Sequence, residues 1–226
     1  MSYMWNDFNI KTFAAETIVY RDGKYCPELS TIKDGPIDKK YDLPVHIIYT
    51  GEIAGKCRLN IEINVAEQDV FLSADIKSKK PAFLNIFIKN AGKNSNLRGH
   101  VMIENACSVN FDCTGRHLAP NTGILVQTKL YAHRDTVSVL SGHAVIEKDA
   151  VNAASDIGFS AMAERGARME FNPAQKISAV PISAEHSAAI YTPSAPQILY
   201  LREAGLSGAE CEEVTKEAFR NDFSLF

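Results

Sequence analysis

A succession of short strand-like runs fills residues 45–182, and this pattern limits the possible folds most strongly. Polar and apolar residues alternate in several runs, as in Leu59-Asn60-Ile61-Glu62-Ile63-Asn64-Val65. Such alternation is typical of a strand with one buried face. Many short strands at regular spacing predict a sandwich, a barrel or a solenoid. The runs are 45–49, 58–65, 70–76, 83–89, 99–103, 108–113, 124–131, 136–140, 144–147, 157–161 and 168–171.

A polar turn followed by a strand recurs within this region, at 66–72, 132–138, 146–152 and 163–169. The last three copies are spaced by roughly 15 residues, about half of one coil of a β-helix. Small residues that follow an Asp or Gly corner, such as Ala150 and Ala167, would let successive coils stack closely. The repeat favours a β-helix. An irregular antiparallel sandwich with similar turns remains the alternative.

The first 40 residues have a mixed character. Residues 7–16 predict a short helix, because Phe8, Ile10 and Phe13 fall near one face. The two runs 17–20 and 24–25 flank Asp22-Gly23, which predicts a β-hairpin. A charged connection then leads to the strand-rich region.

The pattern changes twice after Ile177. Residues 177–182 indicate one more strand, and a cluster of small and polar residues follows at 183–189. Residues 197–206 and 207–219 predict two helices, with Gly205 placed to end the first. Ser207 is suited to cap the second, with Glu210 completing a capping box. We therefore expect a segment 1–40, a mainly β core 41–190 and a helical segment 191–226.

Composition excludes several classes of function. The 226 residues carry a formal net charge of −3, which gives no general attraction to nucleic acid or an anionic membrane. No apolar run approaches the roughly 18 residues of a membrane span, and the N-terminus lacks the pattern of a signal peptide. Five widely separated cysteines suit a reducing compartment. We expect a cytoplasmic protein without nucleic-acid or membrane partners.

The C-terminal part resembles the signature of the SufB/SufD family, the scaffold proteins of an iron–sulfur cluster assembly system. The residues that carry the resemblance are Phe171-Asn172-Pro173, Glu185-His186-Ser187-Ala188, Ile198-Leu199-Tyr200-Leu201-Arg202-Glu203-Ala204-Gly205-Leu206 and Ala218-Phe219. The segment 17–30, which ends in Pro27-Glu28-Leu29-Ser30, also resembles SufD-type proteins. The resemblance implies a right-handed parallel β-helix with a small C-terminal helical segment, and a protein that is not itself an enzyme.

The resemblance also implies partners. The C-terminal helices of the family bind the ABC-type ATPase SufC, and the residues carried over to that contact are Leu199, Tyr200, Leu201, Arg202 and Phe219. The alternative is that Leu199, Leu201 and Phe219 only pack the tail on the body. We further expect a homodimer or a heterodimer with a SufB-like paralogue. The chain carries neither a Walker A motif nor a Gly-x-Gly-x-x-Gly motif, so nucleotide chemistry would come from the partner.

His186 and Glu185 are the candidate cluster or metal ligands. An imidazole can ligate iron, and a neighbouring carboxylate can orient it or bind as well. The resemblance places this histidine near the SufB partner and implies no stably bound cofactor, only a transient iron–sulfur cluster at a subunit interface. SufB-type proteins have a Glu-His-Glu triplet here, whereas this chain has Ser187 in the last place. It also lacks a cysteine between Thr114 and Glu185, where a SufB-type catalytic cysteine is expected, so the chain is more SufD-like.

Three further readings remain open. His186 could be an ordinary hydrogen-bonded histidine. The chain could bind an ABC-type ATPase without any iron–sulfur role. It could also be a carbohydrate-active β-helix enzyme, for which a deep acidic groove along the solenoid would be the sign.

Overall fold

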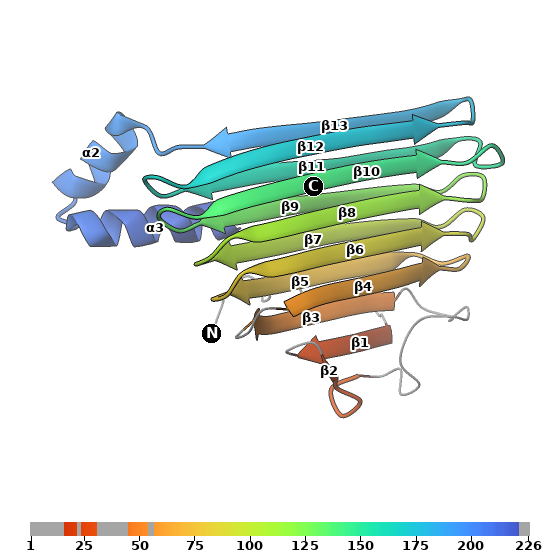
Figure 1. Ribbon diagram of the computed structural model, residues 1–226, viewed down its shortest axis with the longest axis horizontal. Coiled ribbons are helices and arrows are strands. Elements are labelled where there is room, and N and C mark those ends of the chain that lie inside the picture. Colours follow the sequence, from red (N-terminus) through yellow and green to blue (C-terminus); the bar gives the residue numbers. More distant parts are fainter. Residues whose placement is uncertain (1–15, 22–23, 31–44, 54–56, 222–226) are drawn as a thin grey trace.

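The computed structural model describes residues 16–21, 24–30, 45–53 and 57–221 (Figure 1). Within these described ranges, thirteen strands are followed by two helices. The strands are β1 (Glu16–Arg21), β2 (Lys24–Tyr25), β3 (Val45–Ile53), β4 (Cys57–Val65), β5 (Val70–Ser78), β6 (Ala82–Asn90), β7 (Asn96–Asn105), β8 (Val109–His117), β9 (Gly123–Ala132), β10 (Val137–Ile146), β11 (Ala153–Ala163), β12 (Arg168–Ile177) and β13 (Ile182–Tyr191). The helices are α2 (Ala195–Glu203) and α3 (Gly208–Asn221).

The chain winds between two parallel sheets. Sheet A has the order β13-β11-β9-β7-β5-β3-β1-β2, and sheet B has the order β12-β10-β8-β6-β4. From β3 onward, odd and even strands therefore alternate between the sheets, and each of these strands pairs in parallel with the strand one coil away. The result is a β-solenoid of about four turns, as predicted. The parallel pairing rules out the antiparallel sandwich.

Alternation along each strand builds the interior. In β6 the residues Leu84, Ile86 and Ile88 are buried, while Phe83 and Lys89 on either side of them are exposed. Because a strand turns successive side chains to opposite faces, the apolar set of each strand meets that of the opposite sheet. Burial of these apolar side chains makes the main favourable contribution to the free energy of folding of the stacked coils.

Aromatic rings fill the upper part of the interior. The ring of Phe159 lies edge-on to Phe111, with centroids 6.3 Å apart, and stacks on Phe171 at 6.1 Å. Gly142 leaves space for this cluster, since a Cβ there would lie 2.8 Å from a ring carbon of Phe159. A larger residue at this position would force the packed rings apart.

Asparagines turn one corner of successive coils. Asn94, Asn121 and Asn152 have φ angles of 55°, 56° and 58°, a left-handed conformation that asparagine tolerates better than most residues. Their side-chain amides also form a ladder. Asn152 donates to Asn121 at 3.1 Å, and Asn121 donates to Asn94 at 2.9 Å. At the opposite corner Asp135 and Gly166 take positive φ angles, in keeping with the predicted Asp and Gly corners.

Two local predictions near the end of the solenoid are wrong. Of the predicted strand 177–182, only the two end residues lie in strands, Ile177 at the end of β12 and Ile182 at the start of β13, and 178–181 form the corner between them. The small-polar cluster 183–189 lies within β13. Val180, in the middle of the predicted strand, is 79% exposed. Residues 136–140 and 144–147, predicted as separate strands, lie largely in the single strand β10.

At the N-terminal end, β1 pairs antiparallel with β2, which confirms the hairpin pairing. The strand β1 also pairs in parallel with β3 and so extends sheet A. The helix predicted for residues 7–16 lies outside the described residues except for Glu16, which begins β1.

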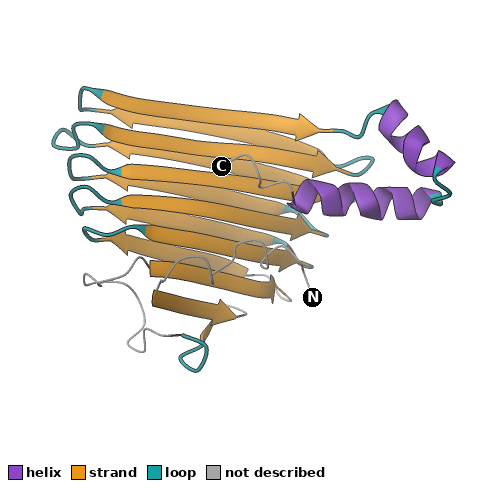
Figure 2. Ribbon diagram, turned by 180° about the vertical axis from the view of Figure 1, so that it is seen from behind, coloured by secondary structure: helices purple, strands orange, loops and turns teal. Residues whose placement is uncertain are grey.

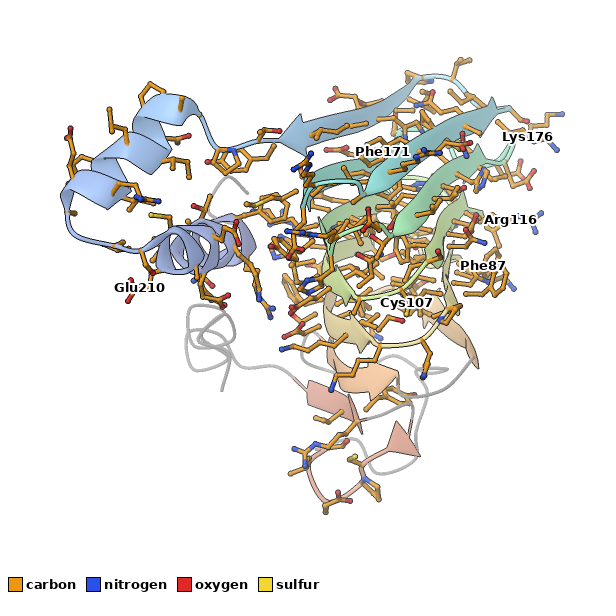
Figure 3. The ribbon with its side chains drawn as sticks, turned by 60° about the vertical axis from the view of Figure 1, so that its left-hand side comes forward. Phe87, Cys107, Arg116, Phe171, Lys176 and Glu210 are labelled. Carbon is orange, nitrogen blue, oxygen red and sulfur yellow. The ribbon has the colours of Figure 1, made fainter. Side chains whose placement is uncertain are left out.

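The helix α2 leads away from the last coil, and α3 runs back toward the solenoid (Figures 1 and 2). Gly205 follows α2 with a φ of +95°, as its predicted position after the helix requires. The predicted capping box of α3 is present, because Ser207 donates its amide to Glu210 at 2.7 Å and accepts the Glu210 amide at 3.3 Å. Glu210 lies in the first turn of α3, away from the sheets (Figure 3). A second capping box, between Ser194 and Gln197, begins α2.

Candidate functional site: the last coil and the C-terminal helices

The last coil places Glu185 and His186 on opposite faces of β13. Glu185 is exposed on the outer face of sheet A, whereas His186 is half-buried and turned toward β12 across the solenoid interior. Because neighbouring residues of a strand point to opposite faces, the two side chains do not converge on one point. In this geometry they do not form a two-ligand metal site.

Both ring nitrogens of His186 face backbone carbonyl groups. Its Nδ1 lies 3.1 Å from the oxygen of Ile157 in β11, and its Nε2 lies 3.2 Å from the oxygen of Ala174 in β12. The ring thus bridges sheet A and sheet B at the end of the solenoid. A neutral imidazole can donate only one of these two hydrogen bonds. To ligate a metal, the ring must turn at least one nitrogen away from its carbonyl.

Glu185 lies beside a second carboxylate. Asp156 is its register partner on β11, and burial together with the charge of Glu185 raises the pKa of Asp156. Gln127 donates to the Asp156 carboxylate at 3.3 Å. Asp156 and Glu185 line a shallow hollow of about 320 Å³ on the outer face of sheet A, to which Arg98 also contributes. The hollow reaches β13, the last strand of the sheet.

The helix α2 presents apolar side chains to solvent. None of its residues is buried, and Leu199 and Tyr200 are 58% and 72% exposed. Leu201 is half-buried, and Arg202 is exposed near the end of the helix. A helix with large apolar groups in solvent has the character of a protein docking element.

The helix α3 holds this element on the body. Phe219 packs against Met102, Tyr131 and Met162 on the outer face of sheet A and is only 7% exposed. Its ring stacks on Tyr191 with centroids 6.0 Å apart. Phe219 is therefore a packing residue of the tail in this structure.

A network of charges reinforces the same contact. Arg220 is 3% exposed and pairs with Glu104 at 2.7 Å and with Asp75 at 3.3 Å. Lys216 pairs with Glu104 at 3.2 Å, and Lys129 donates to the Phe219 carbonyl at 2.8 Å. Burial alone would raise the pKa of Glu104, but the hydrogen bond of His133 and the charge of Lys216 lower it to about 2.

The comparison with protein families decides the identity. The family model described as "SUF system FeS cluster assembly, SufBD core domain" matches residues 72–219, from β5 to the buried Phe219 of α3. The chain belongs to the SufBD core family. No curated protein matches it at a significant level.

Sequence reasoning missed the residues that attach α3 to the SufBD core. Arg220 and Asp75 are 145 positions apart in the chain, and no local pattern relates them. His133 is shared by two carboxylates, at 3.0 Å from Glu104 and 2.9 Å from Glu164. The signal in the sequence that could have pointed to this contact was Lys216, a basic residue in the last turn of the helix predicted for 207–219. A positive charge at that end of a helix is also favoured by the helix dipole.

Other candidate ligands of this SufBD-type chain lie apart from one another. Within the described residues, no group of three or more His, Cys, Asp or Glu side chains is placed to hold a metal ion. His143 lies on the outer face of sheet B, 3.0 Å from Asp112, whereas His117 is buried inside the solenoid with its Nδ1 2.8 Å from the Thr122 hydroxyl. Cys113 is buried, and burial raises the pKa of its thiol.

The outer face of sheet B carries a second hollow, of about 630 Å³. It is lined by Phe83, Leu84, Asn85, Asn110, Phe111, Asp112, Val139 and Ser141. Asp112 is the one carboxylate in this lining, so the hollow lacks the acidic character that a carbohydrate-cleaving site would show. Phe87, Arg116 and Lys176 are spread over the strands on this side (Figure 3). No helix in the described ranges is long and apolar enough to cross a membrane.

Proposed function

We propose that this chain is a non-catalytic, SufD-like component of a cytoplasmic iron–sulfur cluster assembly complex. It binds an ABC-type ATPase through α2 and associates with a second SufBD-type core through its last coil. The family match supports the assembly role in general. The SufD-like character rests on the sequence Glu185-His186-Ser187 and on the lack of a cysteine between Thr114 and Glu185.

The observation that carries the proposal is the exposure of α2 on an anchored support. Leu199 and Tyr200 are mostly in solvent, while α3 fixes the helical pair to sheet A through Phe219 and Arg220. Removing two large apolar side chains from water is favourable for association. ATP-driven movement of a bound ATPase would be transmitted to the core through this rigid attachment.

The test is co-purification of this chain with the ABC-type ATPase of its host. The double variant Leu199→Ser/Tyr200→Ser is expected to weaken the complex at least roughly tenfold, because truncated interface anchors typically cost more than 1 kcal/mol each. Val214→Ser is the matched control, since Val214 is an apolar residue of α3 that is 44% exposed. Equal binding by wild type and the double variant would contradict docking through α2.

Cluster formation in the ATPase complex distinguishes the proposed assembly role from simple ATPase binding without an iron–sulfur role. Iron and sulfide reconstitution under anaerobic conditions is expected to give cluster absorbance in the ATPase complex, and His186→Ala is expected to reduce it. An ATPase complex whose absorbance never develops would indicate an ATPase-binding module without an iron–sulfur role.

A further inference from the structure

The hollow on the outer face of sheet A is formed by two rows of outward-facing side chains. The register of the parallel strands β7, β9, β11 and β13 aligns the members of each row across the sheet. The first row holds short residues: Asn96, Gly123, Ala154 and Ser183. The second row holds longer ones: Arg98, Leu125, Asp156 and Glu185. The short row leaves the depression, and the second row borders it with charged groups.

The second row separates a cation from two carboxylates. Arg98 lies on β7 and Asp156 on β11, with Leu125 of β9 between them. Two strand spacings put the backbones of Arg98 and Asp156 about 10 Å apart. Within the part of the chain that the structure describes, the Arg98 guanidinium forms no ion pair, and no Lys or Arg side chain pairs with Glu185. Both signs of charge in the hollow are therefore open to a ligand.

The Asp156 carboxylate is held in place from below. Gln127, which is 8% exposed, donates to it at 3.3 Å. Gly158 makes room for this contact, because a Cβ there would lie 2.1 Å from the Gln127 amide oxygen and 2.5 Å from the Ser187 hydroxyl. Burial and the charge of the neighbouring Glu185 raise the pKa of Asp156. Two adjacent carboxylates of this kind favour a bound cation.

We propose that this hollow binds a small zwitterion, an α-amino acid, with its ammonium group at Asp156 and Glu185 and its carboxylate at Arg98. An α-amino acid carries both charges on one carbon atom, so a single small molecule can satisfy both ends of the second row. A guanidinium offers paired donors that match a carboxylate, and an ammonium group donates to carboxylates. Leu125 lies between the charges and provides an apolar contact for the carbon atoms of the ligand.

The distribution of charge disfavours simpler ligands. A small anion at Arg98 would be repelled by the two carboxylates of the same row, and an amine at Asp156 would leave the guanidinium of Arg98 without a partner. No group of three or more His, Cys, Asp or Glu side chains in the described ranges is placed to hold a metal ion. A ligand with one charge of each sign is complementary to the whole row.

Titration of the intact chain with three probes tests this pairing of charges. The probes are L-alanine, propionate, which keeps only its carboxylate, and ethylamine, which keeps only its ammonium group. L-alanine is expected to shift the backbone amide resonances of Arg98, Leu125 and Asp156 saturably. It should bind at least roughly tenfold more tightly than either of the other probes, because each of these lacks one charge-assisted contact.

Two variants should remove the preference from opposite ends. Arg98→Gln is expected to make L-alanine bind no better than ethylamine, since the carboxylate loses its partner. The double variant Asp156→Asn/Glu185→Gln is expected to make it bind no better than propionate. Asp112→Asn is the matched control, because Asp112 is a half-buried carboxylate on the outer face of sheet B. It should change the affinity for L-alanine by less than about twofold.

Two results would overturn the inference. One is an affinity for L-alanine that equals those of propionate and ethylamine or that survives Arg98→Gln. The other is the lack of a saturable shift at these amides with every standard amino acid. The ATPase is absent from these titrations, so their outcome is independent of the proposed assembly role.

Discussion

At the scale of single residues, His186 has a structural role at the end of the solenoid that is separate from any role as a metal ligand. His186 connects two sheets through carbonyl groups of Ile157 and Ala174. We therefore expect His186→Ala to lower the free energy of unfolding by about 1–2 kcal/mol even without iron, because the packing of the bridging ring and its hydrogen bond to a carbonyl are lost. Glu185→Ala, on the exposed face of the same strand, is the matched control and should be within about 0.5 kcal/mol of wild type. Thermal unfolding in metal-free buffer measures both.

A histidine that served only as a metal ligand would give the opposite result. In that case His186→Ala would unfold like wild type without iron and would differ only after iron and sulfide are added. The two outcomes separate a bridging role from a ligand role, and the comparison with Glu185→Ala excludes a general sensitivity of β13.

Glu104 makes the attachment of α3 dependent on pH. Its pKa in the folded chain is about 2, below the ordinary value of 4.5. The contribution of ionised Glu104 to the free energy of unfolding is fully present above pH 4.5. It is lost as the pH falls toward 2, because the Glu104 carboxylate is protonated at a higher pH in the unfolded chain than in the folded chain. We expect a loss on the order of 2 kcal/mol over this range, and Glu104→Gln should remove this part of the pH dependence.

The same variant tests the charge network at neutral pH. Glu104→Gln leaves Arg220, whose side chain is 3% exposed, paired with the carboxylate of Asp75. Breaking a buried ion pair by removing one partner typically costs about 3–5 kcal/mol, and the second carboxylate should reduce this cost. If urea unfolding at pH 7 gave the same free energy of unfolding for Glu104→Gln and wild type, the charge network would not be what attaches α3 to sheet A.

At the scale of elements, the two capping boxes allow α2 and α3 to be weakened separately. Ser207→Ala removes the cap of α3 and should destabilise it by about 1 kcal/mol, which would appear as faster amide exchange along the helix and a lower melting temperature. Ser194→Ala acts on α2, which has no buried residue. It should leave the melting temperature unchanged and weaken ATPase binding. A fall in melting temperature with Ser194→Ala would contradict the independence of α2 from the core.

At the scale of the whole molecule, much of the solenoid could be predicted from the sequence. The half-coil spacing of the turns is a local and repeated pattern, and the predicted caps at Ser207 and Gly205 depend on neighbouring residues alone. The strand β13 was missed because Ser, Ala and Glu have weak strand preferences, and this strand forms through its register with β11. The corner 178–181 was mistaken for a strand because it holds apolar residues, but only Ala179 points into the interior, whereas Val180 is 79% exposed.

The candidate site was predictable only in part, because its geometry also depends on pairing between residues far apart in the chain. The sequence placed Glu185 and His186 side by side, but only the strand shows that they face opposite directions. The exposure of Leu199 and Tyr200 and the burial of Phe219 depend on how α3 meets sheet A. These contacts join residues far apart in the chain, which local patterns do not encode.

The central claim is that this SufBD-type chain works as an assembly component beside an ABC-type ATPase. The most direct test is anaerobic iron and sulfide reconstitution of the complex purified with that ATPase, followed by its absorbance with wild type, His186→Ala and Glu185→Ala. The account predicts cluster absorbance in the complex that His186→Ala reduces at least severalfold. A stable ATPase complex with no absorbance, or absorbance independent of His186, would contradict it.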